Sequence, residues 1–73
     1  MRIEKNVTYW GNVGKREVNR KVNIIETRTS GTKYVNWTQK KKDGSDGQNS
    51  WTELRKFEAW VKGIYEKNPE VTP

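Results

Sequence analysis

Apolar and polar side chains alternate with a period of two over three successive stretches of the chain, a pattern typical of half-buried β-strands. The stretches are 2–10, 16–29 and 32–39, and β-branched and aromatic residues are frequent in each of them. Turn-forming residues separate the stretches at 11–14 and at 30–31. The pattern therefore predicts three antiparallel strands joined by two short hairpin turns.

The period changes to that of a helix after a polar segment, 43–49, which we expect to form a loop. Ser50 and Glu53 make a capping-box pattern, in which each side chain satisfies a free N–H group at the start of a helix. Apolar residues then recur at spacings of three and four as far as about Glu66, which indicates an amphipathic helix. The apolar stripe of this helix consists of Leu54, Phe57, Val61 and Ile64, with Trp60 beside it.

These elements predict an α+β fold, in which a three-stranded antiparallel β-sheet is covered on one face by one C-terminal α-helix (βββα). The chain of 73 residues has the length of one small domain, which we place at 1–67, with a C-terminal tail at 68–73. In the expected register one sheet face is apolar and packs against the helix. The residues predicted on that face are Ile3, Val7, Tyr9, Val18, Val22, Ile24, Val35 and Trp37.

The opposite face of the predicted sheet stays open to solvent, because a single helix covers only one side. It carries two aromatic residues, one central lysine, Ile25, and several amide and hydroxyl side chains. Asn is uncommon in strands, so its repeated occurrence here favours a binding face, with ordinary solvated strands as the alternative. The Asn residues concerned are Asn6, Asn19, Asn23 and Asn36.

The basic charge is concentrated in the first part of the chain. The net charge is +6, from 15 Lys and Arg against 9 Asp and Glu. Residues 1–42 hold 11 basic and 3 acidic residues, whereas 43–73 hold 4 basic and 6 acidic residues. A clustered basic surface is typical of proteins that bind phosphate backbones, and the alternative is that the charge only keeps a small protein soluble.

The residue types exclude several classes of function. The chain has no Cys and no His, which excludes disulfides, thiolate chemistry, imidazole catalysis and zinc fingers. The segment 43–47 does not match the ligand order of a calcium loop, and no catalytic constellation is recognisable, so we expect no metal, no cofactor and no enzyme. No apolar run is long enough to cross a membrane, there is no apolar leader, and the lack of Cys favours the cytoplasm.

The sequence therefore predicts a small basic protein that binds nucleic acid, DNA before RNA, through the exposed sheet face and the basic loops. Asn and Thr favour a duplex, because amides can pair with adenine edges in the major groove. Exposed aromatic residues favour a single strand, because they stack on unpaired bases. The candidate nucleic-acid-binding residues are Trp10, Lys15, Arg16, Asn19, Lys21, Asn23, Arg28, Lys33, Tyr34, Asn36, Lys40, Lys41 and Lys42.

A second interpretation belongs to a different class of protein. A small inhibitor or adaptor of the kind found in phages and mobile elements would use the same charge to dock on an acidic protein surface. Such a partner would be bound through Trp-centred contacts that resist salt. Homodimerisation through the edge strands is also open, because only Lys and Arg protect those edges.

Overall fold

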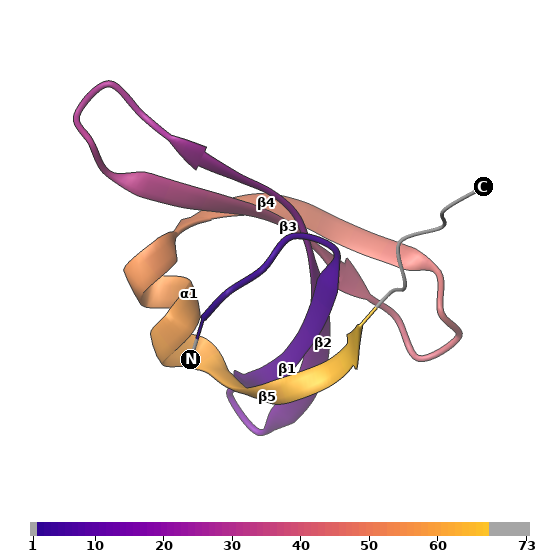
Figure 1. The fold of residues 1–73 in the computed structure, drawn as a ribbon. Coiled ribbons are helices and arrows are strands. Elements are labelled where there is room, and N and C mark those ends of the chain that lie inside the picture. The colour runs from indigo at the N-terminus through magenta and orange to yellow at the C-terminus, as the bar shows by residue number, and fades with distance from the viewer. Residues whose placement is uncertain (1, 68–73) are drawn as a thin grey trace.

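The computed structural model describes residues 2–67 and consists of a five-stranded antiparallel sheet with one short helix (Figure 1). The strand order is β4-β3-β2-β1-β5, so the first four strands form a meander and β5 adds to the free side of β1. The helix α1 joins β4 to β5, which are the two edges of the sheet. The elements are β1 (Val7–Val13), β2 (Arg16–Thr27), β3 (Lys33–Lys40), β4 (Asp46–Glu53), α1 (Leu54–Trp60) and β5 (Val61–Lys67).

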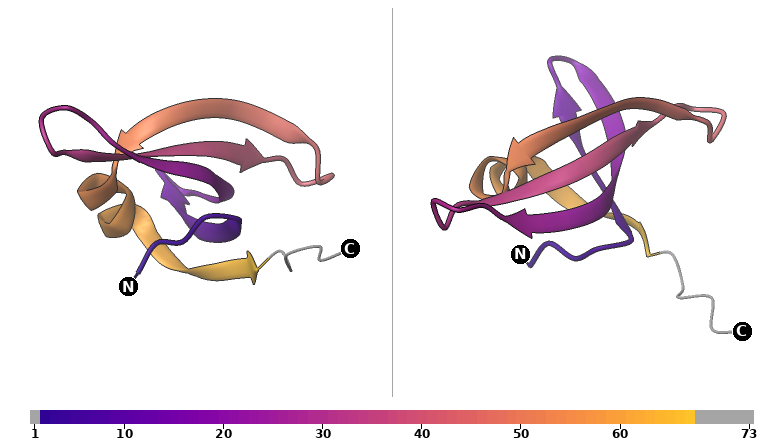
Figure 2. Two further views of the ribbon diagram at one scale, coloured as in Figure 1. Left: turned by 45° about the horizontal axis from the view of Figure 1, so that its top comes forward. Right: turned by 90° about the horizontal axis from the view of Figure 1, so that it is seen from above.

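The sheet is strongly bent, and its concave side holds the helix. Figure 2 shows β2, β3 and β4 arching over α1, while β5 lies on the far side of the helix from β4. Bending of this kind lets a single sheet enclose a core on one side and present a convex surface on the other. We call the concave side the inner face and the convex side the outer face.

The core lies between the inner face and α1, and aromatic residues form its centre. Phe57 of α1 meets the ring of Tyr9 edge-to-face at 6.0 Å between centroids, and it lies 5.4 Å from the ring of Trp60. Aromatic side chains bury a large area each, which compensates for a chain in which only 30% of residues are apolar. The buried apolar residues are Ile3, Val7, Tyr9, Val18, Val22, Val35, Trp37 and Phe57.

The prediction of a three-stranded sheet is wrong, because the sheet has five strands. The segment 43–49, expected to be a loop, contains the β3–β4 turn and the first half of β4. Asp43 shapes this turn by accepting hydrogen bonds from the N–H and the hydroxyl of Ser45, and Gly44 adopts a left-handed φ of 87°. β4 is a mostly polar edge strand, so it has no apolar alternation by which to recognise it.

The prediction of a helix from Ser50 to about Glu66 is also wrong over most of its length. The helix spans only Leu54–Trp60, Glu53 occupies its N-cap position without a side-chain hydrogen bond, and 61–67 form β5. Pairing of β5 with β1 places Gly63 against Trp10, where a Cβ atom would lie 2.7 Å from the indole Nε1. Residues 61–67 therefore form a strand although their apolar spacing also fits a helix, because pairing with β1 outweighs the local pattern.

The first hairpin differs from its predicted register by two residues. The register expected from the sequence sets Tyr9 opposite Val18. Gly14 and Lys15 instead form a two-residue turn, which sets Tyr9 opposite Arg20. A shift of two residues leaves every side chain on its predicted face. Asn6, predicted on the outer face, instead lies in a turn before β1 with a left-handed φ of 66°.

The second hairpin contains an irregularity that exchanges two neighbouring side chains. The β2–β3 register shifts between Val22 and Ile24, which makes Asn23 an extra residue in β2. Ile24, predicted in the core, is therefore exposed, and Ile25, predicted on the outer face, packs against the core. Ile64, predicted in the helix stripe, lies in β5 and is also exposed.

Three expectations from the sequence concern a membrane span, a metal site and the C-terminal tail. Within residues 2–67, no helix is long and apolar enough to cross a membrane. The same part of the chain has no group of three or more acidic side chains arranged to hold a metal ion. The predicted tail at 68–73 lies outside the described residues.

Candidate nucleic-acid interface

The outer face collects polar, basic and aromatic side chains from four strands. Residues that oppose each other in antiparallel strands lie on the same face, so the strand pairings define its members. Trp10, Asn19 and Lys40 form one row across β1, β2 and β3, and Tyr34 pairs with Glu26 and Glu53 in another. The predicted binding residues that lie on this face are Trp10, Asn19, Lys21, Asn23, Arg28, Tyr34, Asn36 and Lys40.

A network of amides occupies the middle of the outer face and connects β2, β3 and β4. Asn23 Nδ2 donates to Asn36 Oδ1 at 3.0 Å and to Thr38 Oγ1 at 2.9 Å. Asn36 Nδ2 donates to Asn49 Oδ1 at 3.0 Å, and Asn49 Nδ2 donates to Thr38 Oγ1 at 3.0 Å. These hydrogen bonds give Asn23 and Asn36 a structural reason to be in strands, so their presence does not require base recognition.

One end of the outer face carries a cluster of Arg28, Tyr34 and Trp51, which we call the Arg28 cluster. The guanidinium carbon of Arg28 lies 4.1 Å from the centroid of the Tyr34 ring and 5.3 Å from that of Trp51. Trp51 is 42% exposed. A guanidinium held over aromatic rings keeps its N–H edge free for phosphate, and exposed rings offer a surface on which bases stack.

The β2–β3 turn sets the position of Arg28. Arg28 N–H donates to Thr32 O at 3.0 Å, and Gly31 N–H donates to Arg28 O at 2.8 Å. Gly31 has a φ of 86°, a left-handed conformation that favours glycine at this point of the turn. The N–H and the C=O group of Arg28 are therefore both held by hydrogen bonds of the turn.

Two lysines lie on the outer face beyond the amide network, and they differ in their partners. Lys40 forms an ion pair with Asp46, and the hydrogen bond from Lys40 holds the pKa of Asp46 below its usual value. Lys21 forms no ion pair with a residue of 2–67, and neither does Arg28. Lys21 and Arg28 are therefore the two outer-face cations that no carboxylate of this region contacts directly, and the charge of Lys21 also lowers the pKa of Asp46.

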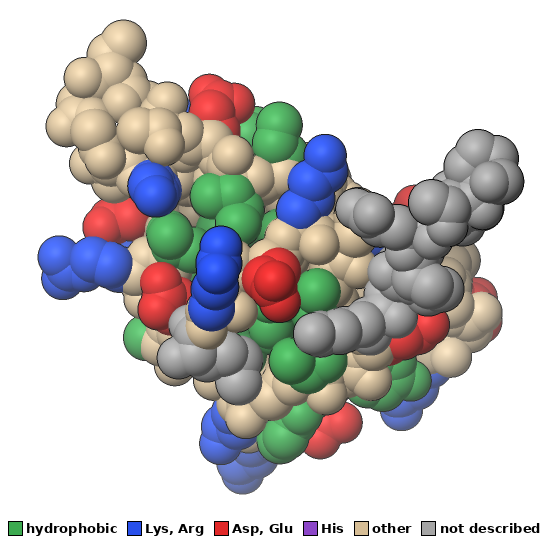
Figure 3. Space-filling model, in the orientation of Figure 1, with side chains coloured by type: hydrophobic (Ala, Val, Ile, Leu, Met, Phe, Trp, Pro, Cys, Tyr) green, Lys and Arg blue, Asp and Glu red, His purple; other side chains and the backbone are tan. Residues whose placement is uncertain are grey.

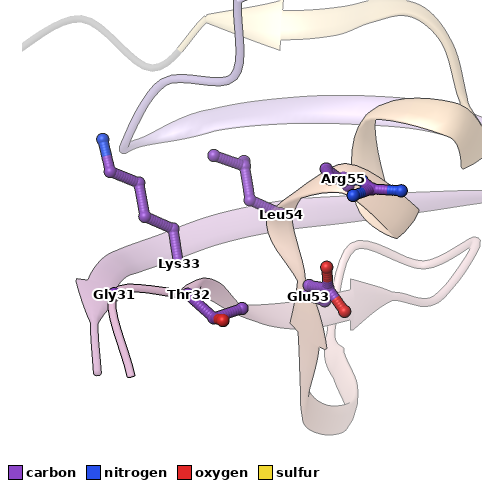
Figure 4. A pocket seen from close by; sticks show the side chains of 6 residues that line it. All are labelled: Gly31, Thr32, Lys33, Glu53, Leu54 and Arg55. Atoms are coloured by element: carbon purple, nitrogen blue, oxygen red, sulfur yellow. The ribbon is translucent and has the colours of Figure 1, made fainter. Parts of the chain in front are cut away.

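The remaining predicted binding residues lie away from the outer face. Lys15 is in the β1–β2 turn, and Lys41 and Lys42 are in the β3–β4 turn. Arg16 pairs with Val13 on the inner side of the sheet. Lys33 also faces inward, where it lines a shallow open pocket with Leu54 and Arg55 near the start of α1 (Figure 4).

A second arginine cluster, which the sequence did not predict, lies on the inner face. The guanidinium carbon of Arg20 lies 3.9 Å from the centroid of the Trp37 ring and 4.5 Å from that of Trp60. Its Nε donates to Gln39 Oε1 at 3.2 Å, and burial lowers the pKa of Arg20. We call these residues the Arg20 cluster, and they close the core where α1 ends.

The position of Trp60 in the Arg20 cluster depends on β1. Trp60 Nε1 donates to Asn12 O at 2.9 Å. The ring lies directly on Gly11, where a Cβ atom would come within 2.6 Å of it. Glycine is therefore required at this point by the close approach of an indole, and this approach brings Trp60 to Arg20.

Two outer-face residues were missed because of the wrong assignment of β4. Asn49 was expected in a loop, and Trp51 was expected in the first turn of a helix. The Asp43-Gly44 pair is a hairpin signal that could have indicated another strand, with Asn49, Trp51 and Glu53 alternating on one face. The capping-box pattern at Ser50 competes with that signal in the sequence.

Basic residues do not form a separate patch on the side of the molecule shown in Figure 3. The surface in Figure 3 shows Lys and Arg side chains interspersed with Asp, Glu and hydrophobic side chains.

Comparisons of the chain with protein-family models, with curated proteins and with solved structures gave no match. The chemistry of the residues themselves is therefore the basis for a functional assignment.

Proposed function

We propose that this protein binds single-stranded nucleic acid through its outer face. The observation that carries the proposal is the Arg28 cluster, in which an arginine without an acidic partner lies over two rings, one of them 42% exposed. Bases stack on Tyr34 and Trp51, and Arg28 contacts the adjoining phosphates. The absence of Cys supports a cytoplasmic location, as the sequence predicts.

Lys21 extends the proposed interface toward the other end of the sheet. It pairs across β2 and β3 with Thr38, a member of the amide network, so it lies on the same face as the Arg28 cluster. A strand of nucleic acid that runs along this face passes from the Arg28 cluster to Lys21. The basic β1–β2 and β3–β4 turns, with Lys15, Lys41 and Lys42, lie at that end and add phosphate contacts.

The amide network favours a single strand over a duplex. Reading adenine in a major groove requires Asn side chains whose donor and acceptor are both free. The amides of Asn23 and Asn36 instead bond to other side chains of the sheet. The aromatic residues of the Arg28 cluster are free of such engagement, and stacking on unpaired bases is their main available interaction. DNA before RNA stays the prediction from the sequence.

The proposal is tested by fluorescence anisotropy of a labelled single-stranded oligonucleotide, with the RNA and the duplex of the same sequence as further arms. Two double variants remove the same charge from opposite faces: Lys21→Gln with Arg28→Gln, and Lys33→Gln with Arg55→Gln. We expect the logarithm of the single-strand binding constant to fall linearly with the logarithm of the salt concentration, with a slope of about −0.7 per phosphate contact. The outer-face variant should reduce the magnitude of this slope by about one to two and weaken binding at least about tenfold. The inner-face variant should change neither the slope nor the affinity.

A third variant tests the same face with the opposite sign. Glu26 and Glu53 flank Tyr34 in the strand pairings, so their carboxylates repel an approaching phosphate. Glu26→Gln should therefore increase affinity for the single strand. Equal weakening by both double variants would show that only total charge matters, and an undetectable affinity at low salt would leave an acidic protein surface as the partner to test.

A further inference from the structure

The outer edge of β4 is an unpaired strand edge. β4 pairs with β3 on one side, and within residues 2–67 no strand lies on its other side. Charged residues and Pro usually prevent an edge strand from pairing, and the stretch 48–52 contains neither. An edge of this kind presents free N–H and C=O groups in a row to any second strand.

The hydrogen bonds of β4 identify which residues carry those free groups. Asn36 Nδ2 of β3 donates to Ser50 O at 3.2 Å, so the backbone groups of Ser50 point toward β3. Antiparallel pairs alternate between residues that bond to the neighbouring strand and residues that do not. The N–H and C=O groups of Asn49, Trp51 and Glu53 therefore point away from β3 toward solvent.

The other edge of the sheet is less suited to pairing. The register between β5 and β1 shifts between Thr8 and Tyr9 and again between Trp10 and Gly11, and such irregularities bend an edge away from regular pairing. β5 also carries the charged residues Lys62 and Glu66. By contrast, the pairing of β4 with β3 runs without a shift from Thr38 to Tyr34.

We propose that the edge of β4 pairs antiparallel with β4 of a second copy of this chain, with the twofold axis at Trp51. Trp51 then lies opposite Trp51 of the partner subunit, and Asn49 lies opposite Glu53 of the partner subunit. This register uses all three residues whose backbone groups are free, and it places no two like charges opposite each other. Cross-strand aromatic pairs stabilise such a ladder, and Trp51, which is 42% exposed, gains such a neighbour on the same outer face.

The neighbouring registers are less favourable for physical reasons. An axis at Glu53 would place two glutamates directly opposite each other. An axis at Asn49 would bring the pairing to Gly47 and Asp46, where the register of β4 on β3 is already irregular. An axis at Ser50 or Thr52 would oppose residues whose backbone groups point toward β3. Trp51 is therefore the centre that satisfies both hydrogen bonding and charge.

The dimer would join two outer faces into one continuous surface, because opposite residues in an antiparallel pair share a face. An edge-strand contact is smaller than the area of about 1,200 Å² typical of stable interfaces, so we expect association that depends on concentration. The inference does not depend on nucleic-acid binding, and it is tested without any nucleic acid present.

The first test is sedimentation velocity of the full chain from about 10 µM to about 1 mM, a range suited to weak interfaces. Wild-type protein should shift from monomer to dimer over this range. Trp51→Glu places like charges at the axis and should stay monomeric. The matched control is Tyr65→Glu, which changes a residue of the other edge that is 58% exposed and should dimerise like wild type.

The second test needs no variant and follows amide hydrogen exchange by residue at low and high protein concentration. Protection of the amides of Asn49, Trp51 and Glu53 should increase with concentration by at least about tenfold. The amides of Ser50 and Thr52 already bond to β3, so their protection should change much less. A wild-type chain that stays monomeric at about 1 mM, a Trp51→Glu variant that dimerises normally, or protection confined to β5 would each overturn the proposal.

Discussion

The Arg20 and Arg28 clusters have a similar arrangement, an arginine over two aromatic rings, but lie on opposite faces of the sheet. Each holds a guanidinium carbon over two aromatic rings, at 3.9 and 4.5 Å for Arg20 and at 4.1 and 5.3 Å for Arg28. Trp37 beside Arg20 is 4% exposed, whereas Trp51 beside Arg28 is 42% exposed. An arginine over two aromatic rings therefore closes the core on the inner face and stays accessible on the outer face.

The difference shows that an arginine over tryptophan is not by itself evidence for a binding site. In the Arg20 cluster, Gln39 takes the guanidinium Nε and Asn12 takes the Trp60 N–H, so the polar atoms are used within the protein. In the Arg28 cluster, neither the guanidinium nor the Trp51 side-chain N–H has a hydrogen-bond partner among residues 2–67. Accessibility and free donors, rather than residue types, distinguish the proposed site from the core.

The two tryptophans provide the largest expected contrast. Trp37→Ala removes a buried ring and should cost about 3–5 kcal/mol of the free energy of unfolding. A domain of this size has about 3–5 kcal/mol in total, so the variant should be largely unfolded at 25 °C. Trp51→Ala should change the free energy of unfolding by less than about 1 kcal/mol. Urea unfolding followed by circular dichroism measures both, and equal losses would contradict the assignment of the two clusters.

The two arginines should differ by a smaller amount and in opposite assays. Arg20→Gln loses two ring contacts in a partly desolvated site and should destabilise the fold by about 1–2 kcal/mol. Arg28→Gln should cost at most about 0.5 kcal/mol, because its site is open to solvent. The order should reverse for single-strand affinity, where Arg28→Gln should bind more weakly than Arg20→Gln. Affinity is measured at a temperature well below the unfolding midpoint of Arg20→Gln, so that both variants are folded. The same order in both assays would remove the distinction between the faces.

Acidification should give the smallest effect, confined to the β3–β4 turn. The pKa of Asp46 is lowered by the hydrogen bond from Lys40, and that of Asp43 by hydrogen bonds from Ser45. Stability from lowered carboxyl pKa values is present above the ordinary value of 3.8 and is lost as the pH falls through the lowered values. Amide shifts of the turn should therefore titrate below pH 3.8, while those of the Arg20 cluster stay constant. Titration of Trp37 in the same range would contradict this separation.

The first hairpin was predictable in its faces but not in its register, and the second was predictable in neither beyond Asn23. A shift of two residues in the first hairpin left Tyr9 and Val18 on the inner face, because the side-chain period is two. The irregularity at Asn23 exchanged Ile24 and Ile25 between the faces. An extra residue in a strand leaves no sign in the apolar pattern, so the sequence could not locate it.

The last third of the described chain was not predictable from periodicity. β4 is polar on both sides because it is an edge strand with little burial, and the segment 61–66 fits a helix stripe as well as a strand. Contact of Gly63 with Trp10 and pairing with β1 decide the second case, and both are long-range. Trp51, the exposed ring of the proposed site, was missed for the same reason.

The most direct test of the proposed site is a titration of isotope-labelled protein with a short single strand, followed by amide and side-chain NMR shifts at low protein concentration. Binding through the outer face should give saturable shifts at Lys21, Arg28, Tyr34 and Trp51 and leave the Arg20 cluster unchanged. Shifts centred on Arg16, Lys33 and Arg55, or no shifts at low salt, would contradict binding through the outer face.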